Sequence, residues 1–169
     1  MAELAGLLGR AAEAGRLAGQ AEGLKRAMNA KQWDAAATAF CDGLCANTTT
    51  RHSAFHASVH PLAFGAADDG HALAAWAFVR GQISASGGMP CGPYPAQFAV
   101  IALYANERDA GCAALELLTN QGTNSWGAML RQGATMTMEM WGASMFNGPS
   151  SQGPVPSGCS PFIWLRRRK

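Results

Sequence analysis

Apolar residues of this chain recur at steps of three and four positions, and this spacing constrains the fold more than any other feature. Steps of this size place side chains on one face of an α-helix, whereas a half-buried strand needs strict alternation, and no convincing alternation appears. The pattern is clearest in the first 28 residues, where the recurring positions are Leu4, Leu7, Leu8, Ala11, Ala14, Leu17, Ala18, Ala21, Leu24 and Met28. The sequence therefore predicts an all-α fold.

Five further helices are expected along the chain. They cover residues 53 to 61 or just past it, 67–83, 93–107, 108–120 and 124–133. Segments 39–50 and 84–90 have the composition of loops. Because short loops join helices of this length, we expect neighbouring helices to pack as antiparallel hairpins.

Length and composition indicate one folded domain followed by a tail. The chain has 169 residues, 49% of them hydrophobic, which is enough for one core. From Asn147 onwards Gly, Pro and Ser dominate, so we predict a domain over residues 1–146 and a disordered tail over residues 147–169. The last four residues are basic, and without them nine basic residues face eleven acidic ones. The net charge therefore gives no reason to expect nucleic acid as a partner.

Targeting signals are not evident in the sequence. The first 16 residues mix acids and arginines with apolar residues, unlike a signal peptide, and the longest apolar runs, ALAAWAFV and FAVIALYA, are too short to span a bilayer. Five scattered cysteines favour free thiols in a reducing compartment over a disulfide framework. We therefore expect a cytoplasmic protein with no membrane partner, and secretion of a full-length parent stays open as an alternative.

One group of residues has the spacing of a metal site. Cys41, Cys45, His52 and His56 form C-x3-C-x6-H-x3-H, and His60 continues the four-residue steps. The interval between the pairs is short for a zinc finger, whose spacer is about twelve residues. The interpretation that we prefer is structural, with His52 beside a helix start, His56 facing a cleft or the core, and His60 at a bend. We expect neither a metal nor a cofactor.

A single carboxylate stands out near the end of the helical region. Glu139 lies in the run RQGATMTMEMW, and the nearest other acid in sequence is Glu116. Either the side chain points at water from an otherwise buried segment, or a pocket holds it for a reaction. Tyr94, Trp126 and Trp141 lie near expected helix ends, and aromatic rings around a carboxylate are typical of a sugar site. Core packing explains such aromatic residues more often.

Four sequence blocks together resemble a known family. In order they are RHSAFHASVHPLAFGAAD, MPCGPYPAQFAVIALY, ALELLT and SWGAMLRQGATMTMEMW. They look like the catalytic domain of bacterial-type α-L-rhamnosidases, and the resemblance covers roughly residues 1–146. It implies a toroid of six helical hairpins, and this chain resembles only the later part of it. The expected architecture is therefore a partial (α/α)6 toroid.

The resemblance also implies a reaction and a set of site residues. Family members hydrolyse terminal α-L-rhamnosyl bonds with inversion, using an acid and a base roughly 6.5–9.5 Å apart. The family segment Gly-(Ala/Ser)-Thr-x-x-x-Glu-x-Trp carries the base, which falls on Glu139. The implied partner is a rhamnosylated glycan or glycoside. The residues whose blocks line the pocket or pack behind it are His56, Tyr94, Gln97, Trp126 and Trp141.

Three departures from the family pattern shape the functional expectation. The family acid lies in an Asp/Arg/Glu cluster before a Gly-Trp pair, and no such cluster occurs here. Ser58 stands where the family often has asparagine, and GASMFNGPSSQGP follows Trp141 instead of the usual His-Ala-Trp-Gly block. We therefore expect a fragment that is inactive alone. One explanation is a split protein, in which a separate chain supplies the missing half of the barrel. The alternative is a non-catalytic helical module that binds sugar or protein.

Overall fold

A computed structural model of the protein describes residues 1–46, 51–106 and 109–141. The described part is mostly helical, which confirms the all-α prediction. In chain order its elements are α1 (Ala2–Leu7), α2 (Ala11–Lys31), β1 (Trp33–Asp34), β2 (Ala39–Phe40), α3 (Phe55–Ala63), α4 (Asp69–Ser86), α5 (Pro93–Tyr104), α6 (Cys112–Thr119) and α7 (Trp126–Arg131). The predicted tail, residues 147–169, and the boundary at 146 lie outside the described residues.

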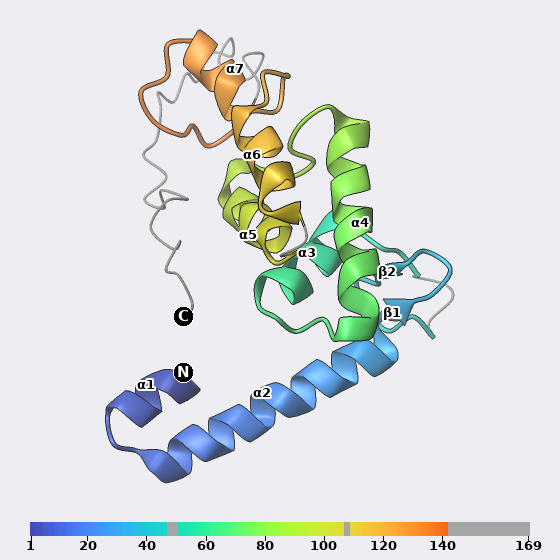
Figure 1. The fold of residues 1–169 in the computed structure, drawn as a ribbon, viewed down its shortest axis with the longest axis vertical. Helices are drawn as coiled ribbons and strands as arrows, with labels where there is room; N and C mark the ends of the chain where they lie inside the picture. Colours follow the sequence, from blue (N-terminus) through green and yellow to red (C-terminus); the bar gives the residue numbers. More distant parts are fainter. Residues whose placement is uncertain (47–50, 107–108, 142–169) are drawn as a thin grey trace, which may run out of the picture.

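The first two helices form an arm, residues 1–31, that extends away from the other helices (Figure 1). The single helix expected here is broken after Leu7, where Gly9 adopts a φ of +71° that other residues rarely take. Of residues 1–31, all of which are described, only Ala5 and Asn29 are buried. The apolar face predicted for this segment therefore exists, but Leu4, Leu7, Leu8 and Leu24 are exposed on it.

One buried amide fixes the end of the arm to the helices that follow. Asn29 Nδ2 donates to the carbonyl oxygens of Lys25 and Ala66, at 2.8 and 2.7 Å. Its Oδ1 accepts the backbone N–H of Asp68 at 3.1 Å. Because Ala66 and Asp68 lie in the loop between α3 and α4, this network sets where α2 meets the rest of the protein.

The remaining elements form the body, residues 33–141. Consecutive helices pack against each other, α3 on α4, α5 on α6 and α6 on α7, and α3 also lies along α5 (Figure 1). The core of the body includes Phe40, Phe55, Val59, Leu62, Trp76, Val79, Met89, Val100, Leu103, Leu117, Met129 and Trp141. The indole N–H of Trp76 donates to the carbonyl oxygen of Leu103 at 3.1 Å, so a polar atom in this core has its partner.

Local signals explain where the body helices begin. The Asp68 carboxylate accepts the N–H of His71 at 3.0 Å and caps α4, and Ser125 caps α7 through Ala128 at the same distance. Pro93 opens α5, as expected of proline in a first turn. The helix expected over residues 108–120 corresponds to α6, which begins at Cys112, directly after Gly111 with its φ of +81°.

One short strand pair was not expected from the sequence. β1 and β2 pair antiparallel, with Trp33 opposite Phe40 and Asp34 opposite Ala39. Strands of two residues are too short to show alternation, so no periodicity could have indicated them. Within the described residues, no helix combines the length and hydropathy needed to cross a membrane.

Candidate active site

The segment after α7, residues 134–141, has no regular secondary structure but is anchored at several points. The indole N–H of Trp126 donates to Thr137 Oγ1 at 3.1 Å. One residue further on, the N–H of Met138 contacts the sulfur of Met129 at 3.4 Å. These contacts hold the middle of the segment against α7, the helix that precedes it.

Trp141 anchors the end of the segment to a distant part of the chain. Its side chain is 7% exposed, and its indole N–H donates to the carbonyl oxygen of Cys91 at 2.5 Å. Its ring meets that of Trp126 edge to face, with centroids 5.0 Å apart. The two tryptophans predicted for the site are therefore in contact, and the loop before α5 lies beside them.

Glu139 lies between these anchors and faces solvent. Met138 and Trp141 are buried, whereas Glu139 is exposed. Within the described residues, no hydrogen bond or ion pair engages its carboxylate. The side chain therefore points at water, as in the first interpretation, but it is not alone in doing so, because Thr135, Met136 and Met140 of the same segment are exposed as well. A carboxylate in this position is able to accept a proton from a water molecule.

A cavity of about 320 Å³ borders the same segment. Its wall is mostly apolar, with two threonine hydroxyls, and consists of Leu118, Trp126, Met129, Leu130, Ala134, Thr135, Met136 and Thr137. Four of these residues belong to segment 134–141. The segment that carries Glu139 therefore also forms one wall of this cavity.

The remaining predicted site residues lie on α3 and α5. His56 is half-buried in the first turn of α3, with its ring 5.8 Å from Phe55 and 6.1 Å from His60. Tyr94 is 53% exposed and Gln97 is half-buried, both near the start of α5. Cys91, which accepts from Trp141, lies just before that start, so these two residues follow the loop that meets the tryptophans. Within the described residues, His56 forms no hydrogen bond or ring contact with either tryptophan.

A comparison with protein families identifies the chain. The model of the bacterial alpha-L-rhamnosidase 6 hairpin glycosidase domain matches residues 1–156. The chain belongs to this family. No curated protein and no solved structure matches it. Membership confirms the resemblance drawn from the four sequence blocks, and it makes the domain one of a glycosidase type.

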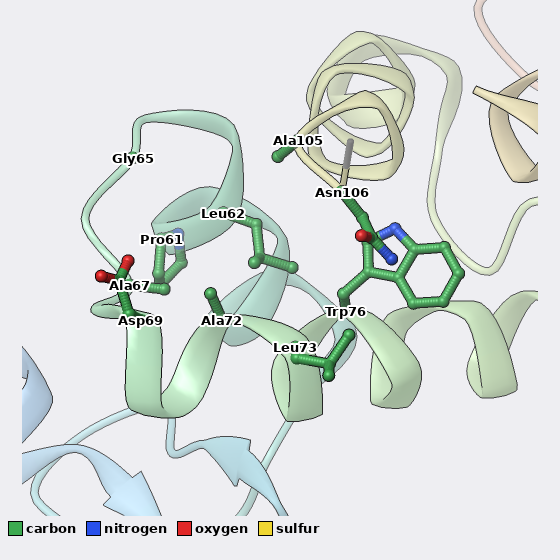
Figure 2. Close-up of a pocket in the computed structure, with 10 residues that line it drawn as sticks. All are labelled: Pro61, Leu62, Gly65, Ala67, Asp69, Ala72, Leu73, Trp76, Ala105 and Asn106. Atoms are coloured by element: carbon green, nitrogen blue, oxygen red, sulfur yellow. The ribbon is translucent and has the colours of Figure 1, made fainter. Parts of the chain in front are cut away.

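A second cavity in this rhamnosidase-family domain was not indicated by the sequence. It measures about 350 Å³ and lies where the end of α3, the start of α4 and the end of α5 meet (Figure 2). The lining is apolar apart from Asp69 and Asn106, and includes Pro61, Leu62, Ala72, Leu73 and Trp76. Its residues come from α3, α4, the loop between them and the two residues after α5, so no single run of sequence could have revealed it.

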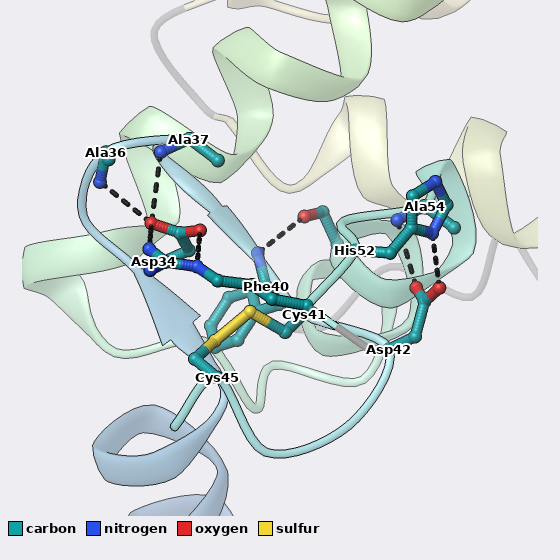
Figure 3. Close-up of a disulfide and its surroundings, with 11 residues drawn as sticks. Asp34, Ala36, Ala37, Phe40, Cys41, Asp42, Cys45, His52 and Ala54 are labelled. Carbon is teal, nitrogen blue, oxygen red and sulfur yellow. Dashed lines mark hydrogen bonds and ion pairs between the residues drawn. A yellow bond between two sulfur atoms is a disulfide. The ribbon is translucent and has the colours of Figure 1, made fainter. Parts of the chain in front are cut away.

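The cysteines depart from the expectation of free thiols. Cys41 and Cys45 are joined in a disulfide with their Cα atoms 5.7 Å apart (Figure 3). Cys91 and Cys112 are free. The expectation was wrong for this pair because the folded loop brings the two Cα atoms within the range that a disulfide spans. Sulfurs in a disulfide cannot act as thiolate ligands, and no group of three or more metal-binding side chains occurs among the described residues. Burial raises the pKa of the Cys91 thiol to about 12.

Two aspartates that the sequence did not single out organise the loop around this disulfide. Asp34 accepts the N–H groups of Ala36 and Ala37, at 2.9 and 3.2 Å, and forms a two-point ion pair with Arg51. The hydrogen bond from Arg51 holds the pKa of the Asp34 carboxyl below its usual value. Asp42 lies nearer to α3, where its carboxylate contacts His52 and accepts the N–H of Ala54 (Figure 3). The hydrogen bond from His52 is the main cause that lowers the pKa of Asp42.

Proposed function

We propose that this chain supplies the base-bearing part of an inverting α-L-rhamnosidase active site, with Glu139 as the general base. The observation that carries the proposal is an exposed carboxylate on a firmly anchored segment. A general base must reach a water molecule and must also hold a fixed position, and Glu139 combines these properties. Family membership supports the substrate class, a terminal α-L-rhamnosyl group.

In this proposal Glu139 takes a proton from water as the water oxygen attacks the anomeric carbon. On the opposite face of the sugar, a carboxylic acid gives its proton to the leaving oxygen, so the configuration inverts. The water contributes the hydroxyl group of the released rhamnose, and the proton removed from it resides on Glu139 until solvent accepts it. The aglycone leaves with the acid's proton.

In this reaction the half-buried Trp126, which lines the 320 Å³ cavity, would contact the sugar, and the buried Trp141 would support it from behind. The N–H group of Trp126 is already bonded to Thr137, so its ring would contribute its face rather than a hydrogen bond. Aromatic faces are well suited to the apolar face of a rhamnose ring. Tyr94, Gln97 and His56 have polar groups for sugar hydroxyls, and we propose them as further substrate contacts.

The proposal includes a lack of activity in these 169 residues alone. The family's acidic cluster has no counterpart among them. A general acid is typically worth 10²–10⁴-fold in rate, and the part of the barrel that carries it also forms half of the pocket. We propose that this part must be supplied, in cis or as a second chain, before a rhamnosylated glycan or glycoside is cleaved.

The test compares nitrophenol release from a nitrophenyl α-L-rhamnoside by four samples. They are the chain alone, the chain joined to the acid-bearing half of another family member (the joined protein), and the joined protein with Glu139→Gln or with Glu116→Gln. Glu116 is an exposed glutamate on α6, paired with Arg80 at 3.5 Å, and serves as the matched control. We expect turnover only by the joined protein and its Glu116→Gln variant.

Two outcomes contradict the proposal in different ways. Robust turnover by the chain alone would show that the acid lies within these residues. Full activity of the joined Glu139→Gln variant would remove Glu139 from the mechanism. A joined protein that binds the rhamnoside and never cleaves it would instead favour the alternative of a non-catalytic sugar-binding module.

A further inference from the structure

The disulfide closes a ring of five residues, Cys41 to Cys45, at the junction between the arm and the body (Figure 3). Both cysteines hydrogen-bond back to the end of α2. The N–H of Cys41 donates to the carbonyl oxygen of Gln32 at 2.7 Å, and that of Cys45 donates to Lys31 at 3.0 Å. The ring is therefore fixed on one side by two backbone bonds.

On its other side the ring presents Asp42 to the start of α3. The Asp42 N–H donates to the carbonyl oxygen of His52 at 2.9 Å, and its Oδ1 accepts the N–H of Ala54 at 2.9 Å. Its Oδ2 lies 2.6 Å from His52 Nδ1. Ala54 is the residue before the first turn of α3, and its own side chain offers no cap. Asp42 thus places a negative charge at the N-terminus of α3, where the helix dipole favours one.

We propose that Asp42 positions the first turn of α3, and with it His56, and that the Cys41–Cys45 disulfide holds Asp42 in place. Reduction of this bond releases that turn. In the reduction, a dithiol reagent gives up two electrons and two protons and forms its own disulfide, while Cys41 and Cys45 become thiols. The effect on α3 stands on these contacts alone, whereas its consequence for catalysis through His56 rests on the proposed function.

The ring is also built so that loss of the bond affects Asp42 more than its neighbours. Phe40 stays in place because it is buried and its N–H donates to Ser58 Oγ at 3.0 Å. Beyond Cys41, Asp42 and Gly43 are exposed, and glycine gains more backbone freedom than other residues once a constraint is removed. Cys45 is half-buried rather than fully enclosed, so a small reductant reaches the bond.

The experiment uses the full chain labelled on its histidine rings, before and after treatment with dithiothreitol. Peptide mapping after alkylation first establishes the Cys41–Cys45 link. On reduction we expect the amide of Ala54 to exchange about tenfold faster, as loss of one hydrogen bond to a charged acceptor implies. The ring resonances of His52 and His56 should shift. The amide of Ala128, capped by Ser125 at the start of α7, is the internal control, and its exchange should not change.

Variants separate the role of Asp42 from that of the disulfide. Asp42→Ala, with the disulfide intact, should reproduce the fast exchange at Ala54 and the shift of His56. Asp42→Asn should restore most of the protection, because its amide oxygen still accepts the Ala54 N–H. Asp69→Ala removes an exposed acid elsewhere and should change neither readout.

Three results would overturn the inference. They are absence of the Cys41–Cys45 link in the oxidised chain, unchanged Ala54 and His56 signals after its reduction, and unchanged signals in Asp42→Ala. Turnover of the joined protein is read separately, and we expect reduction to lower kcat. If the joined protein proves inactive while the signals behave as described, the proposed function fails and this inference stands.

Discussion

The arm and the body are both helical, but they differ in what surrounds their apolar side chains. In the body, leucines such as Leu103 and Leu117 are 1% and 3% exposed. In the arm, Leu7 and Leu24 are 84% and 72% exposed, and α2 packs mainly against α1 and the junction at its end. The difference teaches that helical spacing specifies a helix and its apolar face, whereas burial depends on which partners are present. Exposed apolar faces of this kind favour association with another surface.

The largest expected difference concerns a leucine from each region. Leu103→Ala should destabilise the protein by about 2–5 kcal/mol, because it leaves a cavity in the core. Leu24→Ala should change the free energy of unfolding by less than about 0.5 kcal/mol, because that side chain is already in water. Urea unfolding of the full chain measures both. Equal losses would mean that Leu24 is buried in solution, by self-association or by a different placement of the arm.

Replacing a glycine by alanine should lower the stability of the body and raise the stability of the arm. A Cβ on Gly127, next to Trp126, would lie 2.5 Å from the carbonyl oxygen of Asn120, so Gly127→Ala should cost roughly 1–3 kcal/mol. A Cβ on Gly19 meets nothing within 4 Å, so Gly19→Ala should strengthen α2 by about 1 kcal/mol. Thermal unfolding followed by circular dichroism compares the two. Destabilisation by Gly19→Ala would show that another surface approaches α2 there.

The smallest expected effect is a pH dependence at the junction of the two regions. The pKa values of Asp34 and Asp42 are lowered in the folded state, chiefly by hydrogen bonds from Arg51 and His52. A lowered folded pKa contributes stability that is present above the unfolded value, about 3.9, and is lost as the pH falls through the folded value.

Urea midpoints measured across the acid range test this dependence. We expect the midpoint of the full chain to decline as the pH falls below about 4. Asp34→Asn should lower stability at neutral pH and make the decline shallower, because one of the two titrating groups is gone. Asp69→Asn, an exposed acid outside the junction, should leave the slope unchanged. An identical slope in Asp34→Asn and the parent would contradict the account of the junction.

Much of the fold was predictable because particular residues mark it. Asp68 and Pro93 lie where α4 and α5 begin, and both residue types are typical of helix starts. The break at Gly9 was not predictable, since glycine adopts positive and negative φ about equally and the sequence does not say which. The pairing of Cys41 with Cys45 was not predictable, because the five cysteines are scattered and only the folded loop shows which two meet.

The candidate site was predictable only in part. Glu139 stood out as a lone acid, and its proposed role came from the family segment rather than from periodicity. The contact of Trp141 with Cys91 joins residues 50 positions apart, and such a long-range pairing has no local signal. The role of Asp42 at the start of α3 depends on the ring around it, which likewise exists only in the folded chain.

The most direct test of the central claim, that Glu139 activates water, is azide rescue of the joined protein with Glu139→Ala. Azide is small enough for the vacated space and attacks without losing a proton, so it needs no base. The account predicts that the variant is inactive in buffer, and that azide restores nitrophenol release with formation of a rhamnosyl azide of inverted configuration. Full hydrolysis by Glu139→Ala without azide would contradict it.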